Sequence, residues 1–195
     1  GSHLRRVVKA PGYEWGPSWS PDGRWIAYAR DGGGSPIMAV RSDGTHLHRL
    51  GKRTGEYARY SPDGTRVAYG DTDGQIHVMH ADGTHNHAVT GAGGDYPDWS
   101  PNGRWIGYTL GGDVWKIRPD GTGAIQITNV GTLSYSPVFS PDGRRIAYTD
   151  GSSVWTSKLD GTKVHTGPTG LGGCCVGWQP LLPAPLRQWV MSASR

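Results

Sequence analysis

One turn sequence recurs along this chain at an almost constant interval. An aromatic residue followed by Ser-Pro-Asp-Gly, or once by Ser-Pro-Asn-Gly, begins at Trp19, Tyr60, Trp99 and Phe139, and Trp178-Gln179-Pro180 is a reduced fifth copy. From proline to proline the steps are 41, 39, 40 and 39 residues. A fixed period of this length indicates one supersecondary unit repeated along the chain, and such a unit buries its apolar face only against its neighbours.

A second turn signal divides each repeat. Asp-Gly-Thr begins at Asp43, Asp82, Asp120 and Asp160, and short apolar runs lie between the two kinds of turn. Each repeat therefore predicts four short antiparallel strands, and four-stranded sheets repeated radially form a β-propeller. Prolines in three of the first strands suit a strand edge that faces a channel. The predicted fold class is all-β, a propeller of four-stranded antiparallel blades.

The composition agrees with this fold and excludes some partners. The 195 residues include 32 glycines, 14 prolines and 9 tryptophans, as expected for many short strands joined by tight turns. No apolar run approaches the roughly 18 residues of a membrane span. The net charge is +4, but the basic residues are spread over every repeat, which argues against a nucleic acid partner. Cys174 and Cys175 are adjacent, and we expect two thiols, with a strained vicinal disulfide as the alternative.

Three segments define the predicted domain organisation. Residues 1–3 look like a tag remnant, residues 4–180 form the propeller, and residues 181–195 are a tail that could supply a strand of the closing blade. Leu4 to Lys9 aligns with later fourth strands such as Leu47 to Lys52, so it would complete a blade built elsewhere in the chain. We therefore expect four full blades plus a composite partial fifth. A fragment of a larger propeller and a ring completed by a second copy are the alternatives.

The repeat resembles that of a known family. An aromatic residue, Ser-Pro-Asp-Gly, two further residues, Ile or Val, Ala and Tyr, followed by a strand and Asp-Gly-Thr, is similar to the repeat of TolB-type β-propellers, which are related to WD-repeat propellers. The resemblance covers about residues 4–180. It implies an exported, periplasmic or extracellular protein without enzymatic activity, which binds a protein or peptide at one mouth of the channel, sometimes with calcium.

Aligning the first strands by their aromatic anchors predicts a binding site at that mouth. Equivalent positions in successive blades carry carboxylates and aromatic side chains, and the predicted ligand-binding residues are Trp15, Glu56, Tyr57, Asp95, Tyr96 and Tyr135. Paired carboxylates beside tyrosines suit calcium or the cationic group of a peptide. The alternative is that the aspartates of these loops cap their own backbones.

Two further patterns predict metal ligands. Asp71-Thr72-Asp73-Gly74 begins like a calcium loop but lacks its later ligands. Two histidine pairs occupy equivalent positions in adjacent outer strands, where alternate residues share a face and could chelate a transition metal, although exposed polar side chains are common there. The candidate metal ligands are Asp71, Asp73, His46, His48, His85 and His87.

No sequence motif indicates catalysis. The chain contains no Gly-x-Ser-x-Gly elbow, phosphate-binding glycine loop, His-Glu-x-x-His or Cys-x-x-Cys. The leading hypothesis is a non-enzymatic propeller that binds a peptide or protein, as a monomer or a ring-completing homo-oligomer, with no cofactor expected and calcium as the alternative. The alternatives are a propeller-type lyase or hydrolase that uses mouth carboxylates and histidines, and an accessory propeller domain of a larger enzyme.

Overall fold

The computed structural model describes residues 5–9, 12–31, 35–91, 93–129, 135–161 and 164–166. Within these ranges every regular element is a β-strand, and no helix is long and apolar enough to cross a membrane. In chain order the strands are β1 (Glu14–Trp19), β2 (Trp25–Arg30), β3 (Pro36–Arg41), β4 (His48–Tyr60), β5 (Arg66–Asp71), β6 (Ile76–His80), β7 (His87–Ala88), β8 (Asp95–Trp99), β9 (Ile106–Leu110), β10 (Asp113–Ile117), β11 (Ile125–Gln126), β12 (Tyr135–Phe139), β13 (Arg145–Thr149), β14 (Val154–Lys158) and β15 (Val164–Thr166).

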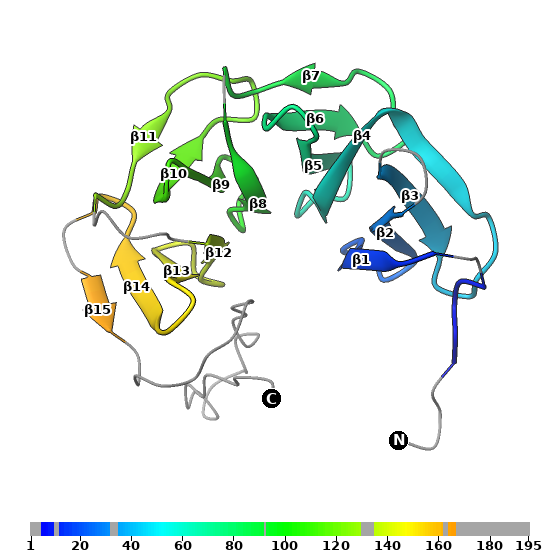
Figure 1. Ribbon diagram of the computed structural model, residues 1–195, viewed down its shortest axis with the longest axis horizontal. Coiled ribbons are helices and arrows are strands. Elements are labelled where there is room, and N and C mark those ends of the chain that lie inside the picture. Colours follow the sequence, from blue (N-terminus) through cyan, green and yellow to red (C-terminus); the bar gives the residue numbers. More distant parts are fainter. Residues whose placement is uncertain are drawn as a thin grey trace.

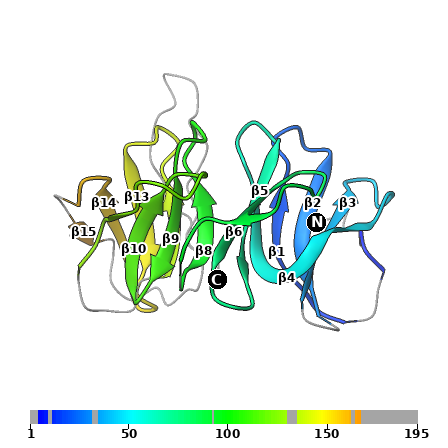
Figure 2. The ribbon, with the colours of Figure 1, turned by 90° about the horizontal axis from the view of Figure 1, so that it is seen from above.

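All neighbouring strands pair antiparallel, as the repeats predict. The sheets run β1 to β7, β8 to β11, and β12 to β15. The long strand β4 pairs with β3 near its start and with β5 near its end, so it belongs to two units. The described residues thus form four four-stranded units, which we call the first to fourth blades. Figure 1 shows them along an arc, with β1, the end of β4, β8 and β12 inside, and Figure 2 shows the same blades from above.

The recurring Ser-Pro-Asp-Gly turn is a closed set of hydrogen bonds. In the first copy the Ser20 hydroxyl donates to Asp22 Oδ1 at 2.5 Å and accepts from the Trp25 N–H at 2.9 Å. Asp22 Oδ1 also accepts from the Arg24 N–H at 3.0 Å. These bonds, that from Ser20 first, lower the pKa of Asp22. Asn102 replaces aspartate in the third copy and accepts the same bonds, so this turn residue acts as a backbone cap.

Successive blades pack a face of large side chains onto a face of smaller ones. Tyr69 in β5 is buried against Ala27 and Ala29 of the preceding blade, and Leu50 from the outer part of that blade joins the cluster. The next two seams repeat this arrangement with Tyr108 and Tyr148, together with Val89 and Ile127, which directly follow the outer strands β7 and β11. One hydrophobic cluster per seam therefore holds neighbouring blades together.

The amino-terminal segment lies against the first blade. Val7 and Val8 pack on the cluster of Tyr28, Met38 and Val40. Residues 5–9 are not a strand, in contrast to the expectation from the alignment, and Leu4 and the expected strands within residues 174–191 lie outside the described residues.

The amino-terminal segment nonetheless lies at a position that recurs between later blades. A Cβ added to Gly44 would lie 2.9 Å from the Val7 carbonyl oxygen. A Cβ on Gly121 would lie 3.3 Å from the Val89 carbonyl oxygen, and the same glycine of the fourth blade, Gly161, approaches Ile127. Val7 therefore contacts the first blade as Val89 and Ile127, which follow the outer strands β7 and β11, contact the third and fourth blades.

The crossover from the first to the second blade requires a glycine. A Cβ at Gly55 would lie 2.5 Å from the Tyr69 ring and would also collide with the Gly70 carbonyl oxygen. We predict that Gly55→Ala lowers the free energy of unfolding by about 2 kcal/mol, because neither a buried ring nor backbone can move away without strain. Urea denaturation measures the change.

Gly91→Ala is the matched control for this substitution. An added Cβ at Gly91 meets no atom of the described residues within 4 Å, and its φ lies outside the left-handed region, so we expect a change below about 0.5 kcal/mol. Equal stability of the two variants would contradict the close approach at Gly55.

Candidate inner binding site

The first strand of every described blade contains the same irregularity. Its pairing with the second strand shifts register between Trp15 and Ser18, and the three later first strands shift at equivalent positions. The second residue of each shift has a positive φ, and these residues are Gly16 (61°), Tyr57 (54°), Tyr96 (54°) and Ser136 (50°). Glycine adopts this conformation freely, whereas other residues pay about 1 to 3 kcal/mol for it. Such bulges redirect side chains and occur beside functional sites.

These four strands enclose a cavity of about 540 Å³, which we call the inner cavity. Its lining residues come from β1, β4, β8 and β12, the strands that lie on the inside of the arc in Figure 1. Pro97 and Pro137 contribute apolar surface to its lining. The side chains that matter for its chemistry are Trp15, Glu56, Tyr57, Arg59, Tyr96 and Asp98.

The predicted tyrosines come together at this cavity. The rings of Tyr57 and Tyr96 have centroids 4.3 Å apart and are tilted by 37°, and the Tyr57 hydroxyl donates to that of Tyr96 at 3.5 Å. Tyr135 meets Tyr96 edge to face at 6.1 Å, although it does not line the cavity. Burial, followed by the hydrogen bond with Tyr96, raises the pKa of Tyr57, so this phenol is neutral at pH 7.

The two predicted carboxylates are placed differently. Glu56 lines the inner cavity, but Asp95 does not. Asp95 is half-buried, and its Oδ1 accepts a hydrogen bond from the Tyr96 N–H at 2.8 Å. Burial raises the pKa of Asp95, the Tyr96 N–H opposes this shift, and the nearby charge of Glu56 adds to it. The structure thus brings Trp15, Glu56, Tyr57 and Tyr96 to one cavity and leaves Asp95 beside it.

Sequence analysis missed two charged residues of the cavity, Arg59 and Asp98. Both precede the aromatic anchor of their blade by one position. Asp98 is half-buried and its Oδ2 accepts from the Phe139 N–H of the next blade at 2.9 Å. Burial raises the pKa of Asp98 to about 6, against the smaller opposing effects of this bond and of the Arg59 charge. Comparing first strands at this position as well as at the two earlier ones would have found the pair.

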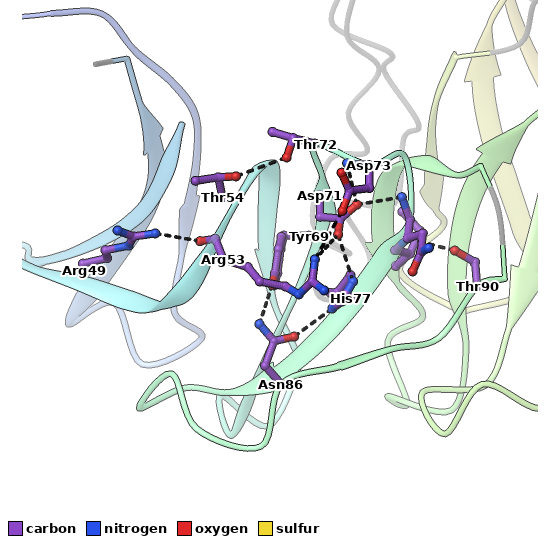
Figure 3. A network of polar contacts seen from close by, with 12 residues as sticks. Arg49, Arg53, Thr54, Tyr69, Asp71, Thr72, Asp73, His77, Asn86 and Thr90 are labelled. Carbon is purple, nitrogen blue, oxygen red and sulfur yellow. Dashed lines mark hydrogen bonds and ion pairs between the residues drawn. The ribbon is translucent and has the colours of Figure 1, made fainter. Parts of the chain in front are cut away.

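Asp71 and Asp73, predicted as calcium ligands, belong to a polar network between the first two blades (Figure 3). Asp71 is almost fully buried, and its Oδ2 lies 2.9 Å from an Arg53 amino nitrogen and 3.0 Å from His77 Nε2. Its Oδ1 accepts from the N–H groups of Asp73 and Gln75. The exposed Asp73 carboxylate lies 3.5 Å from Arg53. Protein donors therefore already occupy both oxygens of Asp71.

The same network holds His77, which was not among the residues predicted from the sequence. Its ring stacks on Tyr69 with centroids 5.5 Å apart, and its Nδ1 lies 2.9 Å from Asn86 Oδ1. Asn86 in turn donates to the Tyr69 hydroxyl (Figure 3). Because Arg53 belongs to the crossover in β4, this network attaches the strand that carries Glu56 and Tyr57 to the second blade.

The predicted histidine pairs are bonded to their own loops. Nδ1 of His48 donates to the His46 carbonyl at 2.8 Å, and Nδ1 of His87 donates to the His85 carbonyl at 3.1 Å. Within the described part of the chain, no group of three or more His, Cys, Asp or Glu side chains is placed to hold a metal ion. Metal binding by these residues stays a prediction.

Comparison with known proteins identifies the fold. No protein-family model and no curated protein matches the sequence. The structure is similar to that of a protein assigned as TolB from Agrobacterium tumefaciens, with a TM-score of 0.65 and 23% identity over 83% of each chain. It is also similar to TolB from Acinetobacter baumannii, with a TM-score of 0.71 and 22% identity over 84% of this chain and 46% of that one.

A third similar structure is a chain from a nidogen/laminin complex, with a TM-score of 0.67 and 16% identity over 84% of this chain and 66% of that chain. This chain spans less than half of the Acinetobacter baumannii TolB chain. At these identities the similarity establishes the fold, which is that of a TolB-like β-propeller.

The raised pKa of Asp98 predicts how its removal changes stability. The folded state holds the proton up to about pH 6, above the ordinary value of 3.8, so Asp98 contributes stability at low pH that is lost as the pH rises through 6. Asp98→Asn keeps an acceptor for the Phe139 N–H and has no such loss. Its stability relative to wild type should therefore increase by about 2 kcal/mol between pH 4 and pH 6.5.

Asp142→Asn is the control, because Asn102 occupies that turn position naturally. The Ser140 hydroxyl lowers the pKa of Asp142 below its ordinary value of 3.8, so this carboxylate is ionised in the folded and unfolded states over most of the same pH range, and the stability of this variant relative to wild type should hardly change there. Urea denaturation at both pH values measures the two differences. A difference for Asp98→Asn that does not depend on pH would contradict the assignment.

Proposed function

We propose that this chain is a non-enzymatic TolB-like propeller that binds a peptide or protein partner in the inner cavity. The observation that carries the proposal is the repeated left-handed backbone of the first strands, which three non-glycine residues adopt. A backbone conformation that costs energy and recurs around one cavity supports a functional role for that cavity. The similarity of the repeat and of the fold to TolB supports a polypeptide partner and export to the periplasm or beyond the cell.

The chemistry of the lining suits a polypeptide. Trp15, Tyr57 and Tyr96 offer large surfaces with few rotatable bonds, so a partner orders them at small entropic cost. Glu56, Arg59 and Asp98 add charged groups that can orient a bound chain. Aromatic anchors surrounded by a few polar groups are typical of sites that recognise peptides.

We also infer that the chain closes as a five-bladed ring in which residues 5–9 are the outer segment of the closing blade. The placement of Val7 against Gly44, equivalent to that of Val89 against Gly121, supports this inference. The anchor Trp19 is 58% exposed, whereas Trp99 and Phe139, each packed on a preceding blade, are 5% exposed. A preceding blade that begins at the reduced fifth copy of the repeat would cover Trp19.

Selection of peptides on the wild-type protein tests the binding role. A random peptide library displayed on phage is selected against the immobilised chain, and the affinity of the selected peptides is then measured on Tyr57→Ala and Tyr96→Ala. We expect each substitution to weaken binding at least tenfold, or about 1.4 kcal/mol, because each removes an aromatic wall of the cavity.

Tyr13→Ala is the control, since Tyr13 is 78% exposed and does not line the inner cavity. It should leave the affinity unchanged. Peptides that bind the Tyr57 and Tyr96 variants as well as they bind wild type would place the binding surface elsewhere, and failure to select any peptide would contradict the proposed function.

A further inference from the structure

We propose that the inner cavity accepts a cationic side chain, an arginine or lysine of the partner, against the carboxylate of Asp98. This inference rests on the proposed function and adds to it the chemical class of the bound group and the residue that recognises it. Its starting point is that Asp98 carries a charge that its structural role does not require.

The structural role of Asp98 is visible in the first blade as well. Ser18 occupies the same position relative to its aromatic anchor, and its hydroxyl accepts from the Tyr60 N–H of the next blade at 3.4 Å. Asp98 makes the corresponding bond to the Phe139 N–H. A neutral hydroxyl therefore suffices to join the first strands of adjacent blades, and the carboxylate needs another explanation.

Burying the charged carboxylate of Asp98 costs free energy, and neighbouring positive charges offset this cost only in part. Burial works against its ionisation and raises its pKa to about 6, so it is still charged at pH 7. Among the described residues no Lys, Arg or His side chain lies within ion-pair distance of Asp98. Arg59 lines the same cavity, but its amino group donates to the carbonyls of Ala58 and Gly16. A half-buried carboxylate without an ion-pair partner is a site for a ligand cation.

The whole lining agrees with a single positive charge. Glu56 and Asp98 are acidic and Arg59 is basic, so the charged side chains of the cavity sum to about −1 at pH 7. One ammonium or guanidinium group would neutralise this sum. The faces of Tyr57 and Tyr96 attract cations, and the prolines of the lining can cover the apolar stem of a lysine or arginine.

Two short peptides of equal shape test the proposal. The probes are Ac-Ala-Arg-Ala-NH2 and the same peptide with citrulline, which replaces the guanidinium by a neutral urea. Binding is followed by nuclear magnetic resonance titration at pH 7 and low salt. We expect wild type to bind the arginine peptide at least tenfold more tightly than the citrulline peptide, and Asp98→Asn to lose this preference. Asp142→Asn, with the same charge change in a distant turn, should keep it.

The pH dependence provides a second readout. Between pH 7 and pH 5 the affinity of wild type for the arginine peptide should fall severalfold as Asp98 takes up its proton, whereas the residual affinity of Asp98→Asn should fall less. Asp98→Ser, which copies Ser18, serves in place of Asp98→Asn if the latter does not fold. Its unfolding curve checks that the bond to Phe139 is retained.

The outcomes separate this inference from the function on which it rests. Equal binding of the two peptides to wild type, or an arginine preference that survives in Asp98→Asn, would overturn the assignment of Asp98. If peptides selected from the library still depend on Tyr57 in that case, the proposed function stands without the cationic group. If neither tripeptide nor any selected peptide binds, both proposals fail.

Discussion

The contact between the large face of one blade and the small face of the blade before it determines the rest of the structure. The small face must remain small, as Gly107 shows, because an added Cβ there would lie 2.9 Å from Ile146 and 3.0 Å from Phe139. Close packing of this kind leaves little freedom in the position of each blade. The first strands of neighbouring blades therefore converge to distances at which Tyr57 and Tyr96 touch and Asp98 reaches the backbone of β12.

The same packing maintains the strained backbone at the inner cavity. Left-handed residues such as Tyr57 and Tyr96 persist only when the surrounding structure holds them. Here the blades on either side, and the network of Arg53, Asp71 and His77 at the crossover, supply that support. The hydrophobic clusters in the seams between blades stabilise the fold. The less favourable backbone conformations and the partly compensated charge of Asp98 lie at the inner cavity, where the first strands meet. This division is typical of binding sites carried on rigid scaffolds.

The sequence predicted the blades well because their signals are local. The Ser-Pro-Asp-Gly turns, the strands that follow them and the cluster of Tyr57, Tyr96 and Tyr135 all follow from the alignment of repeats. The direction of individual side chains did not follow, because the alternation of faces along a strand breaks at each bulge. Glu56 lines the cavity, whereas Asp95 at the equivalent position accepts a hydrogen bond from the Tyr96 N–H and does not line it. Asp98 supplies the carboxylate of that blade to the cavity.

The histidine pairs also show that the direction of side chains could not be predicted from the alignment of repeats. The prediction that His46 and His48 share one strand face assumes extended backbone at both residues. His46 and His85 instead have φ values of 54° and 53°, and both precede the strands that contain their partners. The polar network around Asp71 depends on contacts between β4, β5, β6 and a loop residue, Asn86, that only the folded chain brings together. Such long-range contacts leave no periodic trace in a sequence.

Every blade needs a neighbour on its large face, and residues 5–9 serve the first blade in this way. The most direct test is the free energy of unfolding of Val7→Ser/Val8→Ser, compared with Arg5→Ser/Lys9→Ser, which changes two exposed residues of the same segment. We expect a loss of about 2 kcal/mol for the valine variant, because apolar contacts with Tyr28 and Val40 disappear, and a change below about 0.5 kcal/mol for the control. Equal stability of the two variants would contradict this role of residues 5–9.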